Sequence, residues 1–199
     1  MNQYPAVFEN TFKSVQRFFL TGILGTAPIA SANSNDLKET RSQFQLAGDI
    51  LQFFPSTFAT TLNFMEEDEE GNKLLLKSVL GGVIITNFLK IAMNDSHLGT
   101  RPNGGAWSFP SGHTSFACTG AAFVKNRYAR THGLIAMNIA AFVGYSRIRA
   151  NKHHARDVIF GCALSFAIDR YFVGEKREEI LIYPSVNEEH FGLLMSYNF

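Results

Sequence analysis

Five apolar segments of helix-like length most limit how this chain can fold. They cover residues 44–65, 74–93, 111–124, 133–145 and 157–173. In the second segment apolar residues recur at the spacing of a helix face, and Pro55 breaks the first. A helix buries its apolar face only by packing against another element. The segments therefore predict an all-α bundle of about five to six core helices.

A chain of 199 residues is long enough for one domain with a sizeable core and short for two. We expect that domain at residues 44–175, followed by a C-terminal tail at 176–199 whose apolar stretches indicate one or two short strands. Residues 1–35 form a separate segment, in which two cations precede an uncharged run that contains Ala30-Ser31-Ala32. That pattern is typical of an export signal, and also of an N-terminal helix, membrane-bound or not, that stops at Pro28.

Composition excludes one class of partner and leaves membrane contact open. The formal net charge is +1 with 18% charged residues, so no large basic surface for nucleic acid is expected. Outside the N-terminal segment no run reaches the roughly 18 uncharged residues of a membrane span. A mean hydropathy of −0.01 also argues against a deeply embedded protein. The 19 Phe residues suit a helical core or a membrane-facing surface.

The two cysteines, Cys118 and Cys162, lie in apolar stretches and have no neighbouring Cys or His at the spacing of a metal site. The plainer interpretation is that they are two small buried apolar side chains. A disulfide between them stays open if the protein resides in an oxidising compartment.

Three segments place cationic and polar side chains at expected helix boundaries, where they can converge on one anion. The first contains Lys90 and Arg101, the second is Pro110-Ser111-Gly112-His113, and the third runs from Arg147 to Asp157. A helix that begins after Pro110 directs the free N–H groups of its first turn, and the positive end of its dipole, toward an anion. Three cations beside such a helix start suit a tetrahedral oxyanion. We expect a phosphate group to bind Lys90, Arg101, Ser111, Gly112 and Arg147.

His153 is the candidate nucleophile and Asp157 the residue that orients it. They are four residues apart, so on the first turn of a helix they share one face, and the carboxylate can hold one ring nitrogen while the other faces outward. This arrangement suits a nucleophile rather than a metal ligand. His113, on another element, is the candidate general acid and later base. Together they predict phosphoryl transfer through a phosphohistidine, without a metal or other cofactor.

Taken one at a time, these residues have ordinary structural explanations. Lys90 can extend along a helix to solvent, His113 can cap a helix, and Arg147 can pair with Asp157 on the surface. The ordered set of three segments favours phosphate chemistry over these separate explanations.

The same segments resemble the motifs of the type 2 phosphatidic acid phosphatase (PAP2) superfamily, which shares its fold with vanadium haloperoxidases. Pro110-Ser111-Gly112-His113 matches the second motif, and Ser146-Arg147, His153 and Asp157 match the third without a gap. The first motif departs, because the ten residues between Lys90 and Arg101 are more than the family usually has. The resemblance covers residues 48–173. It implies that His153 attacks phosphorus, His113 is the general acid, Asp157 orients the nucleophile, and no metal is required.

The resemblance also implies a substrate class and a location. It implies a phosphatase that hydrolyses a lipid phosphomonoester or pyrophosphate, such as phosphatidic acid, phosphatidylglycerophosphate, undecaprenyl diphosphate or lipid A. It implies a membrane or membrane-associated protein of the bacterial cell envelope, with its site facing the periplasm or the outside. Two alternatives stay open: a vanadate-dependent haloperoxidase, and a membrane protein that binds phosphate or lipid without turnover. Added vanadate distinguishes the phosphatase from the haloperoxidase, since it inhibits a phosphatase and activates halide oxidation by a haloperoxidase.

Overall fold

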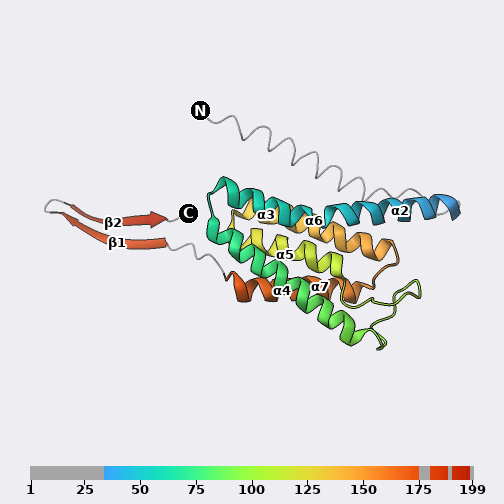
Figure 1. The fold of residues 1–199 in the computed structure, drawn as a ribbon. Helices are drawn as coiled ribbons and strands as arrows, with labels where there is room; N and C mark the ends of the chain where they lie inside the picture. The colour runs from blue at the N-terminus through green and yellow to red at the C-terminus, as the bar shows by residue number, and fades with distance from the viewer. Residues whose placement is uncertain (1–33, 175–179, 188–189, 198–199) are drawn as a thin grey trace. The chain divides into compact units, whose positions relative to one another are not determined.

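The computed structural model describes residues 34–174, 180–187 and 190–197 (Figure 1). The chain divides into two compact units, residues 1–40 and 41–199. Of the N-terminal segment expected at residues 1–35, as an export signal or a helix, residues 1–33 lie outside the described residues. That expectation stays a prediction.

The described residues form a set of helices followed by two short strands. The helices are α2 (Ser34–Leu51), α3 (Phe54–Met65), α4 (Glu69–Met93), α5 (Gly112–Arg127), α6 (Arg130–Arg149) and α7 (Ala155–Phe172). The helical bundle predicted from the apolar segments is confirmed. Pro55 divides the first segment as expected, because it lies in the first turn of α3, where its missing N–H costs no helical hydrogen bond.

Strands β1 (Ile180–Asn187) and β2 (His190–Tyr197) lie where the sequence predicts short strands. They form an antiparallel two-stranded sheet. Its register runs from Ile180 opposite Tyr197 to Asn187 opposite His190.

Helix α5 is the centre of the bundle, since it packs against α3, α4, α6 and α7 (Figure 1). Small residues make this possible by letting the neighbouring backbones come close. A Cβ atom added at Gly120 would lie 2.4 Å from the backbone nitrogen of Ser56 on α3. The side chains of Ala117, Ala121 and Phe123 are all fully buried. The helix that begins at the second motif is therefore held by four neighbours.

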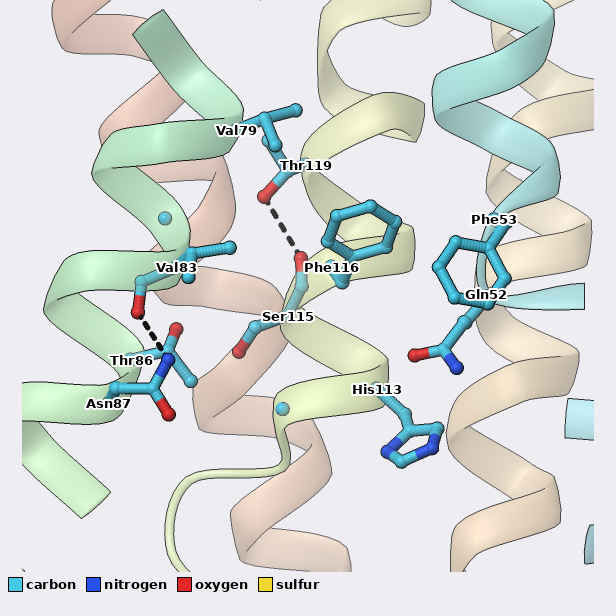
Figure 2. A pocket seen from close by; sticks show the side chains of 12 residues that line it. Gln52, Phe53, Val79, Val83, Thr86, Asn87, His113, Ser115, Phe116 and Thr119 are labelled. Carbon is cyan, nitrogen blue, oxygen red and sulfur yellow. Dashed lines mark hydrogen bonds between the residues drawn. The ribbon is translucent and has the colours of Figure 1, made fainter. Parts of the chain in front are cut away.

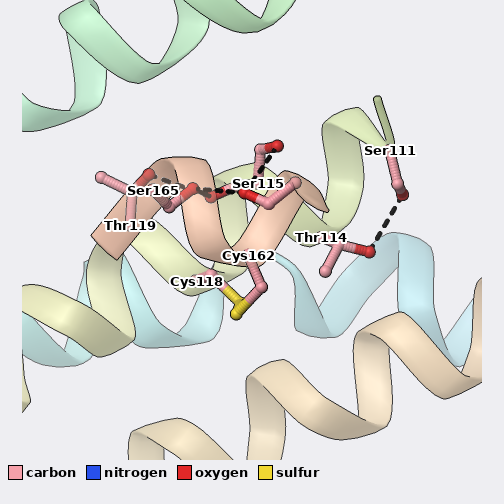
Figure 3. Close-up of a disulfide and its surroundings, with 8 residues drawn as sticks. Ser111, Thr114, Ser115, Cys118, Thr119, Cys162 and Ser165 are labelled. Carbon is pink, nitrogen blue, oxygen red and sulfur yellow. Dashed lines mark hydrogen bonds between the residues drawn. A yellow bond between two sulfur atoms is a disulfide. The ribbon is translucent and has the colours of Figure 1, made fainter. Parts of the chain in front are cut away.

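A disulfide joins α5 to α7 through Cys118 and Cys162, whose Cα atoms are 5.2 Å apart (Figure 3). The plainer interpretation of two separate apolar side chains was therefore wrong. The structure contains the disulfide that the sequence left open as an alternative. The bridge adds a covalent link between the helix that carries His113 in its first turn and the helix that carries Asp157.

Helix α4 is long and apolar enough to cross a membrane, by length and composition. Within its most apolar window, of mean hydropathy 1.7, 22% of the residues are buried. The exposed apolar side chains include Leu80, Ile84, Phe88 and Ile91. The expectation that no segment beyond the N-terminus qualifies as a span was too strict. Lys77 and Lys90 interrupt the uncharged run, but the mean hydropathy of α4 stays high enough for a membrane span.

Candidate active site

The three predicted segments meet at one end of the bundle. The last turn of α4 supplies Lys90, the loop at residues 94–111 supplies Arg101, and the first turn of α5 supplies His113. Helix α6 ends with Arg147 in its last turn, and the next loop carries His153 to the start of α7. Hydrogen bonds between these elements hold them together: Lys90 Nζ donates to the carbonyl of Pro110, and the Ser111 N–H donates to the carbonyl of Asp157.

Lys90 stays at the site despite the long spacer that follows it. Its Nζ donates to the carbonyl oxygens of Trp107 at 2.9 Å and of Pro110 at 2.8 Å. The spacer folds back through turns, in which the Gly99 N–H donates to the carbonyl of Ser96 and the Ser108 N–H donates to the carbonyl of Gly99. The ten residues between Lys90 and Arg101 therefore do not carry the two cations apart.

Arg101 lies beside Lys90 with part of its guanidinium unused. Its Nη2 is 3.5 Å from the carbonyl oxygen of Trp107, which is a long contact for a hydrogen bond. Its Nε is buried and has no hydrogen-bond partner among the described residues. A buried N–H donor without an acceptor is costly, and an anion in front of it would remove that cost.

Asp157 is fully buried at the start of α7 and accepts hydrogen bonds from two donors in the described part of the chain. The hydroxyl of Ser108 donates to its Oδ2 at 2.5 Å, and the N–H of His154 donates to the same oxygen at 2.9 Å. The second bond is the reciprocal half of a capping box, which helps start α7. The carboxylate is thus fixed both by the loop before α5 and by its own helix.

His153 is buried, with 4% of its surface exposed, and faces the Asp157 carboxylate. Its Nδ1 lies 3.8 Å from Asp157 Oδ2, beyond hydrogen-bond range but close enough for an electrostatic interaction. Burial, followed by the charges of Lys90 and Arg101, lowers the pKa of His153 to about 3, while the Ser108 backbone and Asp157 act in the opposite direction. The imidazole is consequently neutral near pH 7 and keeps a free lone pair.

His113 and Arg147 share one carboxylate, that of Asp49 on α2. His113 Nε2 is 2.9 Å and Arg147 Nη1 is 2.6 Å from Asp49 Oδ1. Arg147 Nη2 also donates to the carbonyl of Gln45 at 2.6 Å. The surface pair between Arg147 and Asp157, which was the alternative explanation for these residues, is not formed in the described part of the chain, and Arg147 is only 2% exposed.

Ser111 and Gly112 lie at the start of α5 as expected, but only Gly112 borders open space. Ser111 is fully buried; its hydroxyl pairs with that of Thr114 at 2.9 Å, and its N–H is taken by the carbonyl of Asp157. Gly112 faces open space, since a Cβ built on it meets nothing within 4 Å. The helix start therefore offers an anion the N–H groups that follow Ser111, rather than the Ser111 side chain.

A cavity of about 210 Å³ adjoins His113 and Gly112. Figure 2 shows α4 on one side of it, Gln52 and Phe53 on the other, and α5 between them. Its lining includes Val79, Val83 and Phe116 together with hydroxyl and amide groups. The cavity gives the cationic end of the bundle a partly apolar neighbour.

Sequence reasoning missed two residues that the structure brings to the site, Asp49 and Ser108. Ser108 carries a weak signal, because it stands just before the second motif in a loop that already contained Arg101. Asp49 carries none, since a single aspartate on a polar helix face is ordinary. Within the described residues, no group of three or more His, Cys, Asp or Glu side chains is placed to hold a metal ion.

The chain is similar in sequence to known phosphatases. The family model described as "PAP2 superfamily" matches residues 73–174. The lipid A 4'-phosphatase of Helicobacter pylori (strain J99) is 25% identical over 189 residues, which cover 90% of this chain and 93% of that protein.

Two crystal structures share the fold. Aquifex aeolicus LpxE has a TM-score of 0.50 at 22% identity, covering 66% of this chain and 93% of its own. A transmembrane PAP2-type phosphatidylglycerolphosphate phosphatase from Bacillus subtilis has a TM-score of 0.53 at 21% identity, covering 81% of this chain and 93% of its own. The family match spans just over half of the 199 residues and includes all three motifs. The chain therefore belongs to the PAP2 superfamily of phosphatases.

Proposed function

We propose that this protein removes phosphate from a lipid phosphate through a phosphohistidine formed on His153. The observation that carries the proposal is a buried imidazole that faces the carboxylate of Asp157 and is kept neutral by burial and by the charges of Lys90 and Arg101. Such an imidazole is a free nucleophile, and the cations beside it suit the phosphoryl group that it would attack.

The first step transfers the phosphoryl group from substrate to enzyme. A ring nitrogen of His153 attacks phosphorus, the bond to the leaving oxygen breaks, and that oxygen takes a proton from His113. Lys90, Arg101 and Arg147 stabilise the negative charge on the other phosphoryl oxygens, as do the N–H groups at the start of α5. Asp157 holds the imidazole and stabilises the positive charge that it acquires.

The second step returns the enzyme to its starting state. Water attacks phosphorus and gives a proton to His113, the nitrogen–phosphorus bond breaks, and orthophosphate leaves. His153 is again neutral and His113 again protonated. The 3.8 Å between His153 Nδ1 and Asp157 Oδ2 is compatible with this cycle, since catalytic hydrogen bonds are often long in a free enzyme and shorten on substrate binding.

Two features favour a lipid substrate and a membrane location. The partly apolar cavity beside His113 can take the first part of an acyl chain, and the exposed apolar face of α4 suits contact with a bilayer. The similar Helicobacter protein is named for lipid A, so lipid A is the substrate we would test first, beside phosphatidic acid, phosphatidylglycerophosphate and undecaprenyl diphosphate. The disulfide suits an oxidising compartment, which favours a site facing the periplasm or the outside.

The test is phosphate release by the purified protein, without added metal, from these lipids and from 4-nitrophenyl phosphate. His153→Ala should lower release at least about 10³-fold, since removing a nucleophile abolishes the covalent route. His97→Ala is the matched control, because the His97 side chain is exposed and only its backbone carbonyl makes a described contact. Alkaline quench and mass spectrometry should find a phosphoryl group on His153. Equal release by native protein and His153→Ala would refute the proposal.

A further inference from the structure

Helix α2 carries a carboxylate to the site from outside the region that the family model matches, residues 73–174. Asp49 Oδ1 touches both His113 Nε2 and Arg147 Nη1, at 2.9 and 2.6 Å. We propose that Asp49 is a positioning residue for the reaction, which fixes the imidazole of His113 and favours its protonated form until the leaving oxygen takes the proton. The inference rests on the function proposed above.

The contact between α2 and the site is built into one face of the helix. Gln45, Gly48 and Asp49 follow the spacing that places residues on the same side of a helix, and Gln52 comes directly after the end of α2. The carbonyl of Gln45 accepts from Arg147, and Gln52 lines the cavity beside His113. Gly48 allows this approach, since a Cβ there would lie 1.9 Å from the hydroxyl of Ser146 and 2.5 Å from Arg147 Nη2. Asp49 is therefore held at the site by its whole helix face.

The charges around His113 give Asp49 its role. The described charged groups that act on His113 are Arg147 from α6, Lys90 from α4 and Asp49 from α2. Burial and the two cations lower the pKa of His113, and Asp49 raises it through its charge and a hydrogen bond. A general acid must carry a proton when the substrate binds. Without Asp49 the named influences on His113 would all favour loss of that proton.

This role predicts a dependence on the leaving group. An alkoxide leaving from a lipid phosphate is strongly basic, so it needs the proton of His113 as its bond to phosphorus breaks. A nitrophenolate is weakly basic and leaves with little help from an acid. Loss of Asp49 should therefore slow the lipid reaction more than the aryl reaction, whereas a purely structural defect should slow both equally.

The experiment measures both substrates with Asp49→Asn, dioctanoyl phosphatidic acid serving as the lipid. We expect the ratio of the lipid rate to the 4-nitrophenyl phosphate rate to fall about tenfold or more, within the 10²–10⁴ that a general acid contributes. The high-pH limb of the lipid kcat/KM profile should also move to lower pH, because the pKa of His113 falls. Glu66→Gln removes an exposed carboxylate at the end of α3 and should change neither quantity.

Two outcomes would overturn the inference while leaving the phosphatase proposal intact. They are an unchanged ratio with an unchanged high-pH limb, or a faster lipid reaction, which would mean that Asp49 competes with the phosphate for Arg147. The ratio of the lipid rate to the aryl rate does not depend on the fraction of folded enzyme. The high-pH limb of the kcat/KM profile can be measured with the lipid substrate alone. Asp49→Ser carries the same test if Asp49→Asn does not accumulate, and Asp49→Glu should restore the ratio. Failure of the phosphatase proposal is seen separately, as equal release by native protein and His153→Ala.

Discussion

Replacing Ser108 with alanine tests how far catalysis depends on the way Asp157 is held. The hydroxyl of Ser108 donates to Asp157 Oδ2 at 2.5 Å, and both side chains are fully buried. In the described part of the chain the carboxylate would then keep one hydrogen bond, from the His154 N–H. A hydrogen bond to a charged group contributes about 1.5–3 kcal/mol. About 1.4 kcal/mol corresponds to a factor of ten in rate. If the whole free energy of this hydrogen bond is lost from the transition state, kcat should fall about 10- to 150-fold.

The assay compares kcat on a lipid phosphate and the melting temperature for Ser108→Ala and Ser165→Ala. Ser165 is the matched control, because it is equally buried but donates to the neutral carbonyl oxygens of Ser115 and Gly161. We expect Ser165→Ala to cost at most about 1.5 kcal/mol of stability and no activity. Should Ser108→Ala keep more than half of the native kcat and melt together with Ser165→Ala, the reasoning about Asp157 is refuted.

Two further predictions concern pH and the disulfide. Activity should be highest in mildly acidic solution. His113 works protonated and its pKa is lowered from the usual 6.5, so activity falls as the pH rises through the pKa of His113. His153, with a pKa of about 3, stays neutral until the pH approaches 3. A kcat/KM profile that is still rising between pH 7 and 9 would contradict this assignment. Reduction of the disulfide should lower the free energy of unfolding of the native protein by about 4 kcal/mol, because the bridge closes a loop with a sequence separation of 44. The melting temperature should fall by about 10 °C. The double variant Cys118→Ala/Cys162→Ala should show no response to reductant, and equal melting of native protein with and without it would exclude a stabilising bridge.

The helices were predictable because their signals are local. Apolar periodicity predicted α4, the length and apolar composition of the later segments predicted the helices after it, and Pro55 marked the start of α3. The exposure of α4 was not predictable in the same way. Whether an apolar side chain such as Phe88 faces a core or the outside depends on which helices pack against it, and an interrupted run such as that around Lys77 does not settle this.

In the candidate site, too, some residues could be predicted from local sequence and others depend on packing. The residues of the three motifs could be expected together, because a phosphate site needs cations, a helix start and a nucleophile at once. Asp49 could not, since it lies on a helix far from His113 in the chain and reaches it only through packing against α6. The partnership of Cys118 with Cys162 was likewise undecided, because spacing says nothing about which faces of two helices meet.

The enclosure of α5 by four neighbours has a consequence for how such proteins diversify. A change in the middle of α5, at Gly120 for example, would disturb several helix contacts at once. The end of the bundle where we propose that phosphate binds therefore tolerates few substitutions. The outer helices are less constrained, because Gln52 and Val83 line the cavity from elements that are partly exposed. We expect members with different lipid preferences to keep the inner helix nearly unchanged and to differ mainly in the walls around it.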